Sequence, residues 1–300
     1  MLTYTINDQD HCRSLWSFLA NLLPGASRGY LAKLAKSGAV QVNGQAATIE
    51  QLLRRHDIIS LKESGRTAEF LAAAPLPVDL LFEDDHLLVL NKPAGLAMHR
   101  TAERDEETLV DRAAQLMRFR GTPANPRPVN RLDRGTSGVV ILAKGGAAAG
   151  MFGRQLKEEG FDKCYLALAS GHLAPDGEFA APIDGKEALT RFQTLAAGAG
   201  VSLVLLRPIT GRTHQIRRHL ADAGHAVRGD SRYGGAPLPG HPGFCLHSFR
   251  TRLQQPATGE WVTVTAPLPD SFQQHLALLA GERLPEILAQ LHTIACNVAS

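Results

Sequence analysis

The segment Pro128–Lys144, PVNRLDRGTSGVVILAK, holds the residues best suited to chemistry in this chain of 300 residues. Asp133 stands between Arg131 and Arg134, in a loop rich in Thr, Ser and Gly that leads into a β-branched strand. Neighbouring guanidinium groups favour the ionised form of a carboxylate, and an ionised carboxylate can act as a nucleophile. The same pattern also fits a structural ion pair beside a turn, so one short motif does not decide between the two.

Three further segments carry candidate functional side chains. They are Phe82–His99 (FEDDHLLVLNKPAGLAMH), Lys163–Gly171 (KCYLALASG) and Thr210–Gly235 (TGRTHQIRRHLADAGHAVRGDSRYGG), and they contain Lys92, Tyr165, Arg212, Ile216 and Arg217. We predict a helix over Thr213–Ala223, which places Arg217 in its first turns. Taken alone, Arg217 also fits a solvated helix residue, Tyr165 a half-buried strand residue, and Ile216 ordinary core packing.

Together with Asn130–Gly138 (NRLDRGTSG), these segments resemble, in the same order, four motifs of the RluA-type RNA pseudouridine synthases. The resemblance covers about residues 78–270. It implies that Asp133 is the nucleophile that attacks a uridine, after the base has left the stack. It also implies that Arg217 is the charge partner of Asp133, and that Tyr165 stacks on the base and assists proton transfer at carbon 5.

The resemblance assigns substrate contacts as well. Arg131 matches the arginine that family members insert into the gap left by the flipped nucleotide, and Ile216 would form an apolar wall beside the uracil. Lys92 and Arg212 match residues that contact RNA or order loops. The chain departs from the family at Asn130, where the usual residue is His. Asn can replace it structurally by capping a turn, which leaves in doubt any proton-shuttling or RNA-contacting role at this position.

The N-terminal residues predict a small basic unit. Residues 12–38 have the periodicity of two short helices, the second starting at Ser27 and stopping at Gly38. Residues 40–44 then predict a strand with an Asn-Gly turn, and residues 56–61 a second strand. This order resembles the S-four-like RNA-binding domain, which implies that the helix face bearing Arg28, Lys33 and Lys36 meets phosphates. Ordinary surface lysines on a helical decoration are the alternative.

The charge distribution agrees with a polyanion-docking role. Residues 1–62 hold seven basic and four acidic side chains and so carry the whole net charge of +3, whereas the other residues balance. A small basic unit joined to a neutral body is typical of an enzyme that docks on nucleic acid.

We therefore expect three segments: an S-four-like domain of α/β type over residues 1–62, a linker rich in Ala and Pro over 63–77, and a catalytic domain over 78–300. The strand pattern alone gives α/β or α+β. The resemblance implies an α+β pseudouridine synthase fold on a mixed, largely antiparallel sheet. A C-terminal helix is predicted over Leu284–Val298.

Several classes of protein are disfavoured. No apolar run approaches the roughly 20 residues of a membrane span, and the N-terminus does not have the pattern of a secretory signal. The four cysteines are far apart, which favours reduced thiols in the cytoplasm over a disulfide framework. Cys245, His247 and His241 lack zinc spacing and fit a packed thiol with surface imidazoles. We expect no metal and no cofactor, since an isomerisation needs none.

The sequence thus predicts a cytoplasmic, monomeric RNA pseudouridine synthase that acts on large-subunit ribosomal RNA, with transfer RNA as the alternative substrate. A non-catalytic RNA-binding or ribosome-assembly factor is a rival, against which the intact Asp133, Tyr165 and Arg217 argue. A nucleoside glycosidase with paired carboxylates is another. The acidic run at residues 83–85 is available for it, but nothing in the sequence pairs that run with Asp133.

Overall fold

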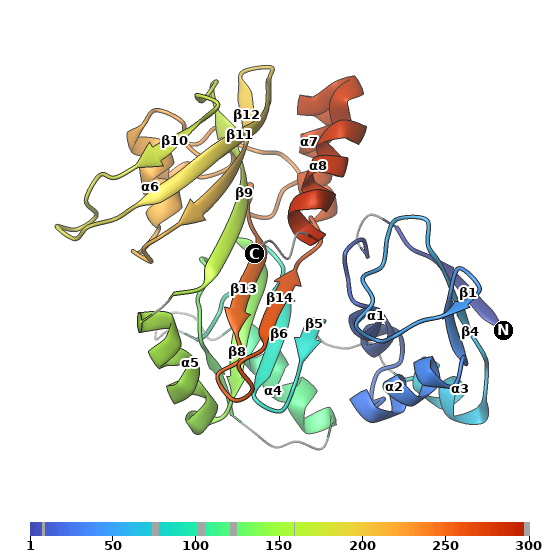
Figure 1. Cartoon of the computed structure of the whole chain (residues 1–300). Coiled ribbons are helices and arrows are strands. Elements are labelled where there is room, and N and C mark those ends of the chain that lie inside the picture. Colours follow the sequence, from blue (N-terminus) through green and yellow to red (C-terminus); the bar gives the residue numbers. More distant parts are fainter. Residues whose placement is uncertain (8–9, 74–77, 101–105, 121–124, 159, 297–300) are drawn as a thin grey trace.

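The computed structural model describes residues 1–7, 10–73, 78–100, 106–120, 125–158 and 160–296, which form two β-sheets with their helices (Figure 1). The small sheet has the strand order β1-β4-β2-β3, and all of its neighbours are antiparallel. Its strands are β1 (Leu2–Thr5), β2 (Val40–Val42), β3 (Gln45–Ala46) and β4 (Ile58–Leu61), and its helices are α1 (Leu15–Leu22) and α2 (Arg28–Lys36).

Local sequence accounts for these elements. The Ser27 side chain caps α2 by accepting from the Tyr30 amide, as the sequence predicts. Asn43 and Gly44 both have positive φ, the conformation that a two-residue hairpin turn needs. The predicted helix pair, hairpin and final strand are therefore confirmed as elements of the fold.

The segment predicted as a linker, residues 63–77, contains a helix that the sequence analysis did not predict. Residues Gly65–Leu71 form helix α3, which begins with a reciprocal capping box between Ser64 and Thr67. The Phe70 ring packs on Tyr30 of α2, so this segment is attached to the small unit. The Ala and Pro composition concealed the cap. Residues 74–77 lie outside the described part of the chain.

The large sheet has the order β10-β11-β12-β9-β13-β8-β6-β5, with β14 beside β13 and β7 beside β8. Among the described strands only the β13–β8 pair is parallel, so the predicted mixed, largely antiparallel sheet is confirmed. The strands are β5 (Asp79–Glu83), β6 (Leu87–Lys92), β7 (Pro126–Pro128), β8 (Ser137–Lys144), β9 (Asp162–Ser170), β10 (Asp176–Phe179), β11 (Thr190–Gly198), β12 (Val201–Pro208), β13 (Leu246–Gln254) and β14 (Trp261–Thr265).

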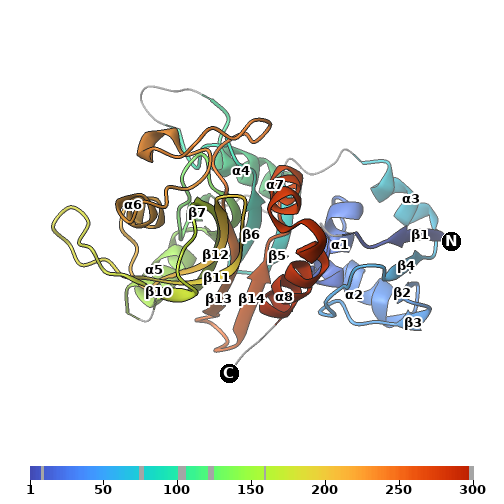
Figure 2. The same ribbon diagram turned by 90° about the horizontal axis from the view of Figure 1, so that it is seen from above.

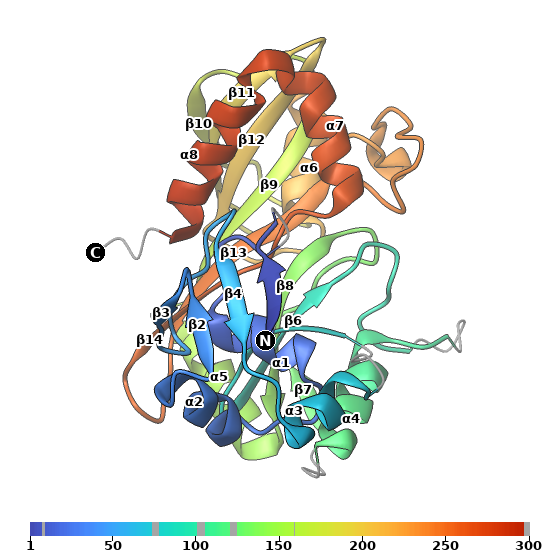
Figure 3. The same cartoon turned by 90° about the vertical axis from the view of Figure 1, so that its right-hand side faces the viewer.

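Alternating side chains direct the helices to opposite faces of this sheet. Tyr165 and Leu206 belong to the buried cluster that includes α6 (Gln215–Asp222), whereas Leu166 and Leu205 belong to the cluster that includes α7 (Asp270–Ala280) and α8 (Leu284–Cys296). In the other half of the sheet, α4 (Leu109–Phe119) and α5 (Gly146–Glu158) pack in separate clusters in the same way. Figure 3 shows α7 and α8 beside β9, β11 and β12. The predicted residues 297 and 298 of the last helix lie outside the described part.

The parallel junction between β8 and β13 requires a glycine. Gly138 has φ +108, and a Cβ there would lie 2.2 Å from the carbonyl oxygen of Ser248. The adjacent residue, Ser137, forms a hydrogen bond with His247 across the same junction, with 2.8 Å between Ser137 Oγ and His247 Nδ1. Ser137 and Gly138, at the end of the Asp133 motif, therefore allow β8 and β13 to pair and so connect the two halves of the sheet.

The small unit is fixed to the free edge of β5 (Figure 2). The Asn21 side chain accepts from the Leu80 amide at 3.1 Å and donates to the Leu80 carbonyl at 2.8 Å. Ser17 donates to the same carbonyl at 2.6 Å, and Arg13 pairs with Asp79 at 2.6 Å. One continuous buried cluster includes residues of both sheets.

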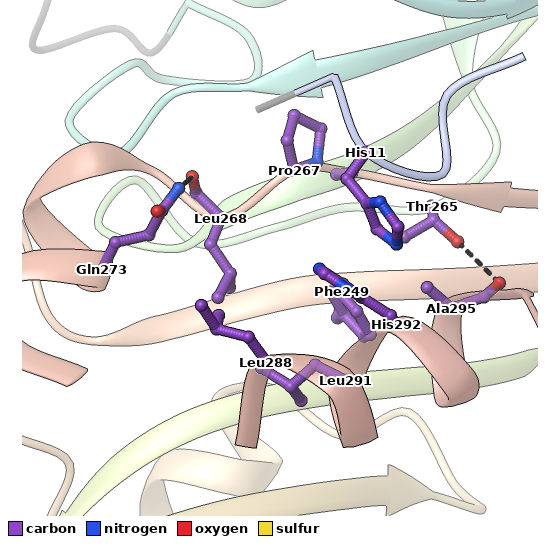
Figure 4. Close-up of a pocket in the computed structure, with 11 residues that line it drawn as sticks. His11, Phe249, Thr265, Pro267, Leu268, Gln273, Leu288, Leu291, His292 and Ala295 are labelled. Atoms are coloured by element: carbon purple, nitrogen blue, oxygen red, sulfur yellow. Dashed lines mark hydrogen bonds between the residues drawn. The ribbon is translucent and has the colours of Figure 1, made fainter. Parts of the chain in front are cut away.

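The N-terminal segment also meets the C-terminal helix. His11 and His292 lie ring against ring beside a cavity of about 30 Å³, lined further by Phe249, Leu268 and Leu288 (Figure 4). Cys12, next in sequence, is disulfide-bonded, whereas Cys164 and Cys245 are free thiols. The expectation of four reduced thiols is therefore wrong for Cys12. Cysteines that are far apart in the sequence can lie close together in the fold, which spacing alone does not show. Among the described residues, no helix has the length and apolar character needed to cross a membrane.

Candidate active site

Asp133 lies on the loop between β7 and β8, and backbone contacts define its position. The Thr136 amide donates to the Asp133 carbonyl at 3.0 Å, closing a turn around the motif. Asn130 is buried and its Oδ1 accepts from the Ile141 amide at 2.7 Å. That bond extends the pairing of the loop with β8, so Asn130 has a structural role here. Gly135 leaves room for Phe244, whose ring would lie 2.6 Å from a Cβ at that position.

Arg217, on α6, is the charge partner that contacts Asp133. Its Nη1 donates to Asp133 Oδ2 at 2.7 Å, while Nε and Nη2 donate to the two oxygens of Asp230 at 2.6 and 2.8 Å. The guanidinium carbon lies 4.2 Å from the Phe244 ring centroid and 4.9 Å from that of Tyr233. Burial lowers the pKa of Arg217, but its bonds to Asp230 and Asp133 outweigh this, and the pKa is raised.

His214 approaches the other oxygen of the same carboxylate. Its Nε2 lies 3.7 Å from Asp133 Oδ1, and its Nδ1 bonds the Tyr233 hydroxyl at 2.9 Å. His214 precedes α6 in the left-handed conformation, with φ 54, so the helix begins two residues later than the predicted Thr213. Burial lowers the pKa of His214, Asp133 opposes this, and Arg217 and Arg232 add to it.

Tyr165 and Ile216 are buried in the same apolar cluster as Leu132 of the Asp133 loop. Burial, together with the charge of Asp133, raises the pKa of the Tyr165 phenol to about 12, against a smaller lowering from the neighbouring Ser248. The phenol is therefore protonated near neutral pH. It can stack and donate a hydrogen bond there, but it is a poor base without a partner that takes its proton.

Of the two roles expected for Lys92, RNA contact and loop ordering, its buried position fits the second. Its side chain is fully buried, and Nζ donates to the carbonyls of Pro93, Leu96 and Arg134 at 3.0, 2.8 and 3.0 Å. These bonds join the loop after β6 to the Asp133 loop. Burial lowers the pKa of Lys92 to about 7, against the opposing charge of Asp133.

The other predicted arginines differ in their surroundings. Arg131 is exposed and bonds nothing in the described part of the chain. Arg134, in contrast, pairs with Glu106 at 2.7 Å and donates to the Gly95 carbonyl at 2.8 Å. Arg212 donates through Nε to the Glu187 carbonyl at 2.8 Å, which orders the loop before β11.

The predicted basic face of α2 is divided. All three side chains are exposed, but Arg28 also lies over the rings of Trp16 and Phe82 and donates to the Glu83 carbonyl at 3.0 Å. Arg28 therefore belongs to the contact between the small unit and β5.

An open hollow of about 260 Å³ adjoins the site. Its walls include Arg134, Arg217, Arg232 and Phe244, with bare backbone at Gly135. Among the described residues, no three His, Cys, Asp or Glu side chains are grouped as metal ligands would be. His247, predicted at the surface, is buried against Ser137 and the Ala266 carbonyl, and burial lowers its pKa to about 4.

Two of the three carboxylates available for a glycosidase are engaged away from the site. Glu83 pairs with Arg120 and Lys144, and Asp84 accepts from the backbone of residues 86 and 87. Asp230, which the sequence reasoning did not single out, is the carboxylate that shares Arg217 with Asp133. Asp230 lies in the sequence RGDSRYGG, within the segment Thr210–Gly235 that resembles the family. An acidic residue in that segment was the feature from which its role could have been predicted.

Comparison with known proteins gives a consistent picture. The family model described as RNA pseudouridylate synthase matches residues 86–222. Ribosomal large subunit pseudouridine synthase D of Xanthomonas campestris pv. campestris is 32% identical over 290 residues, which cover 87% of each chain. Ribosomal large subunit pseudouridine synthase C of Escherichia coli K12 is 30% identical and covers 89% of this chain and 93% of its own.

A solved structure agrees as well. Human RNA pseudouridylate synthase domain containing 1 superimposes with a TM-score of 0.54 at 30% identity, over 71% of this chain and 95% of that one. The catalytic-loop geometry, the sheet and these relatives lead to one assignment: the chain belongs to the RluA-type family of RNA pseudouridine synthases and is an enzyme that isomerises uridine in RNA.

Proposed function

We propose that the chain isomerises specific uridines of large-subunit ribosomal RNA, with Asp133 as its nucleophile. The observation that carries the mechanism is the 2.7 Å bond from Arg217 to one oxygen of Asp133, because it holds the carboxylate oriented and leaves the second oxygen without such a bond. The names of the two bacterial relatives support the choice of RNA.

The proposed reaction divides a difficult exchange into steps. Asp133 forms a covalent adduct with the flipped uridine, the bond to the uracil nitrogen breaks, the base turns, and carbon 5 bonds the sugar. Tyr165 stacks on the base from the buried side, and Ile216 forms the apolar wall. The exposed Arg131 fills the gap that the flipped nucleotide leaves.

The small unit would act as an S-four-like RNA-binding domain over residues 1–62. Lys33 and Lys36 are exposed on α2 and would contact phosphates, which gives affinity rather than sequence choice. On this proposal the enzyme works as a monomer in the cytoplasm.

The test is Asp133→Asn assayed on transcripts of large-subunit ribosomal RNA and of transfer RNA, with pseudouridine counted by mass spectrometry. Wild type should modify the ribosomal transcript, and the variant should bind it with unchanged affinity but form no pseudouridine. Asp85→Asn is the matched control, because Asp85 is exposed in the same domain and bonds nothing in the described part.

Each contrary result has a defined meaning. Turnover by Asp133→Asn would exclude Asp133 as the nucleophile. Modification of the transfer RNA transcript alone would exclude the ribosomal substrate while leaving the chemistry intact. Mapping pseudouridines in ribosomal RNA from cells that lack the gene would then give the positions.

A further inference from the structure

His214 and Tyr233 form an arrangement that the catalytic scheme above does not use. His214 lies between two groups, the Tyr233 hydroxyl at 2.9 Å from Nδ1 and Asp133 Oδ1 at 3.7 Å from Nε2. The two residues come from different segments, since His214 precedes α6 and Tyr233 ends the short helix η1 (Ser231–Tyr233). Their rings meet edge to face at 5.8 Å between centroids.

The backbone at His214 is constrained to deliver this side chain. The residue has φ 54 and ψ 26 and makes no side-chain cap to the helix it precedes. Left-handed conformations are uncommon for residues other than glycine, and such outliers gather at functional sites. Instead of capping the helix, the His214 side chain faces Tyr233 and Asp133.

Arg217 leaves one degree of freedom in the nucleophile. It bonds only Oδ2 of Asp133, and its other two bonds go to Asp230, so the carboxylate can still turn about its last torsion. The imidazole limits that turn from the Oδ1 side. A contact of 3.7 Å is too long for a hydrogen bond, but contacts of this kind shorten when substrate closes a site.

Charge selects the tautomer that makes this contact favourable. The carboxylate of Asp133 attracts an N–H, so Nε2 carries the proton and Nδ1 accepts from the Tyr233 hydroxyl. Burial lowers the pKa of His214, and the charges of Arg217 and Arg232 lower it further. The charges of Asp133 and Asp230 oppose this, but the net effect is a lowered pKa. The imidazole is therefore neutral near pH 7 and does not cancel the charge of the nucleophile.

We infer that His214, held by Tyr233, is a positioning residue that orients the second oxygen of Asp133 toward the uridine. The inference rests on the proposed role of Asp133. It assigns His214 and Tyr233 to the control of the rate of the chemical step and not to RNA affinity.

Two substitutions of His214 separate its side chain from its backbone. His214→Asn keeps a residue that tolerates the left-handed conformation but does not reach Asp133, whereas His214→Gln places an amide N–H near the position of Nε2. We expect His214→Asn to lower the single-turnover rate by about 100-fold, as small misplacements of reacting groups do, with RNA affinity unchanged. His214→Gln should recover most of that loss.

Tyr233→Phe tests the second member without touching the helix start. Loss of one hydrogen bond to Nδ1 should lower the single-turnover rate by about tenfold. Tyr30→Phe is the control, since the Tyr30 ring packs on Phe70 and Arg66 and its hydroxyl bonds nothing in the described part of the chain.

The inference is overturned if His214→Asn turns over at the wild-type rate, or if it loses RNA affinity in the same proportion as rate. Nitrogen NMR of the wild-type protein gives a second measurement that does not depend on activity: protonated Nε2 and unprotonated Nδ1 support the inference, and the reverse tautomer contradicts it. Activity lost in Asp133→Asn but retained in all His214 and Tyr233 variants would refute this inference while leaving the proposed function standing.

Discussion

Arg217 makes its contact with Asp133 because Asp230 fixes the rest of the guanidinium. Two of the three nitrogens of the Arg217 guanidinium donate to Asp230, which is only 1% exposed. The rings of Phe244 and Tyr233 lie against the guanidinium. A planar fork of donors can serve two carboxylates at once, which a lysine ammonium cannot reproduce with the same geometry.

We therefore expect Asp230→Asn to weaken both the fold and the reaction. Removing one charge of a buried pair costs about 3–5 kcal/mol, because the partner stays buried without compensation. Urea unfolding should show a loss of that size, and the single-turnover rate should fall with RNA affinity unchanged. Asp222→Asn, on the exposed end of α6, is the control and should change neither. A fall in RNA affinity that accounts for the whole rate loss would contradict the positioning role of Asp230.

Lys92 gives a prediction with a defined pH dependence. Lys92→Met leaves three carbonyls without their donor, at about 1–3 kcal/mol each where the group stays dry. The folded pKa of Lys92 is about 7, below its ordinary value, so between pH 7 and about 10 the unfolded chain holds more protons than the folded one.

The stability of the wild type relative to Lys92→Met should then rise with pH across that window, since stability increases wherever the unfolded state binds more protons. Unfolding free energies of both proteins at pH 6, 8 and 9.5 measure this. A difference that shrinks from pH 7 to 9.5 would mean that the ammonium is stabilised in the folded state.

At the scale of residues, the sequence predicted the reactive part of the site better than its support. Asp133, Arg217 and Tyr165 stand in short strings whose pattern is informative, and the fold brings all three to one place. Asp230, His214 and Phe244 were missed because their roles depend on distances between segments. For Lys92 the sequence left RNA contact and loop ordering open, and only the three carbonyls that the fold gathers around its Nζ favour loop ordering.

At the scale of elements, α1 acts as a cover for strand β5. Arg13, Ser17 and Asn21 recur every four residues along the first helix and its start, so they share one face. Asn21 bonds both the amide and the carbonyl of Leu80, as a neighbouring strand would. The periodicity in the sequence predicted the helix, but these three polar residues gave no sign of a sheet edge as their partner.

Asn21→Ala should leave the buried Leu80 amide without an acceptor. We expect a loss of about 1–3 kcal/mol in the free energy of unfolding and faster hydrogen exchange at that amide, with the amides of the central strands unchanged. Gln45→Ala, on the exposed strand β3, serves as the control. Unchanged exchange at Leu80 would mean that the edge is closed by other contacts.

At the scale of the whole molecule, the basic unit and the active site belong to one continuous core. The sequence predicted a separate module on a linker, because composition cannot show that Arg28 packs across the contact or that α3 occupies most of the described linker. RNA that binds α2, as proposed, would accordingly be held at a fixed position relative to Asp133.

Lys33→Ala with Lys36→Ala should reduce the salt dependence of RNA binding. Each phosphate contact contributes about 0.7–0.9 to the slope of log affinity against log salt, so the slope should fall by about 1.5. Arg154→Ala with Lys157→Ala is the control pair, because α5 packs in a different cluster from α4 and α6 and both side chains are exposed. Equal slopes for the two pairs would remove α2 from the RNA-contacting surface.

The cover that α1 provides over β5 has a consequence for how the chain can be divided. An open strand edge is a template on which another chain can add a strand. A fragment that begins at residue 78 exposes the Leu80 amide and carbonyl, and it should self-associate through paired β5 edges. The small unit, proposed to dock RNA, therefore also covers this edge of the sheet, and any module exchanged for it must cover the edge too.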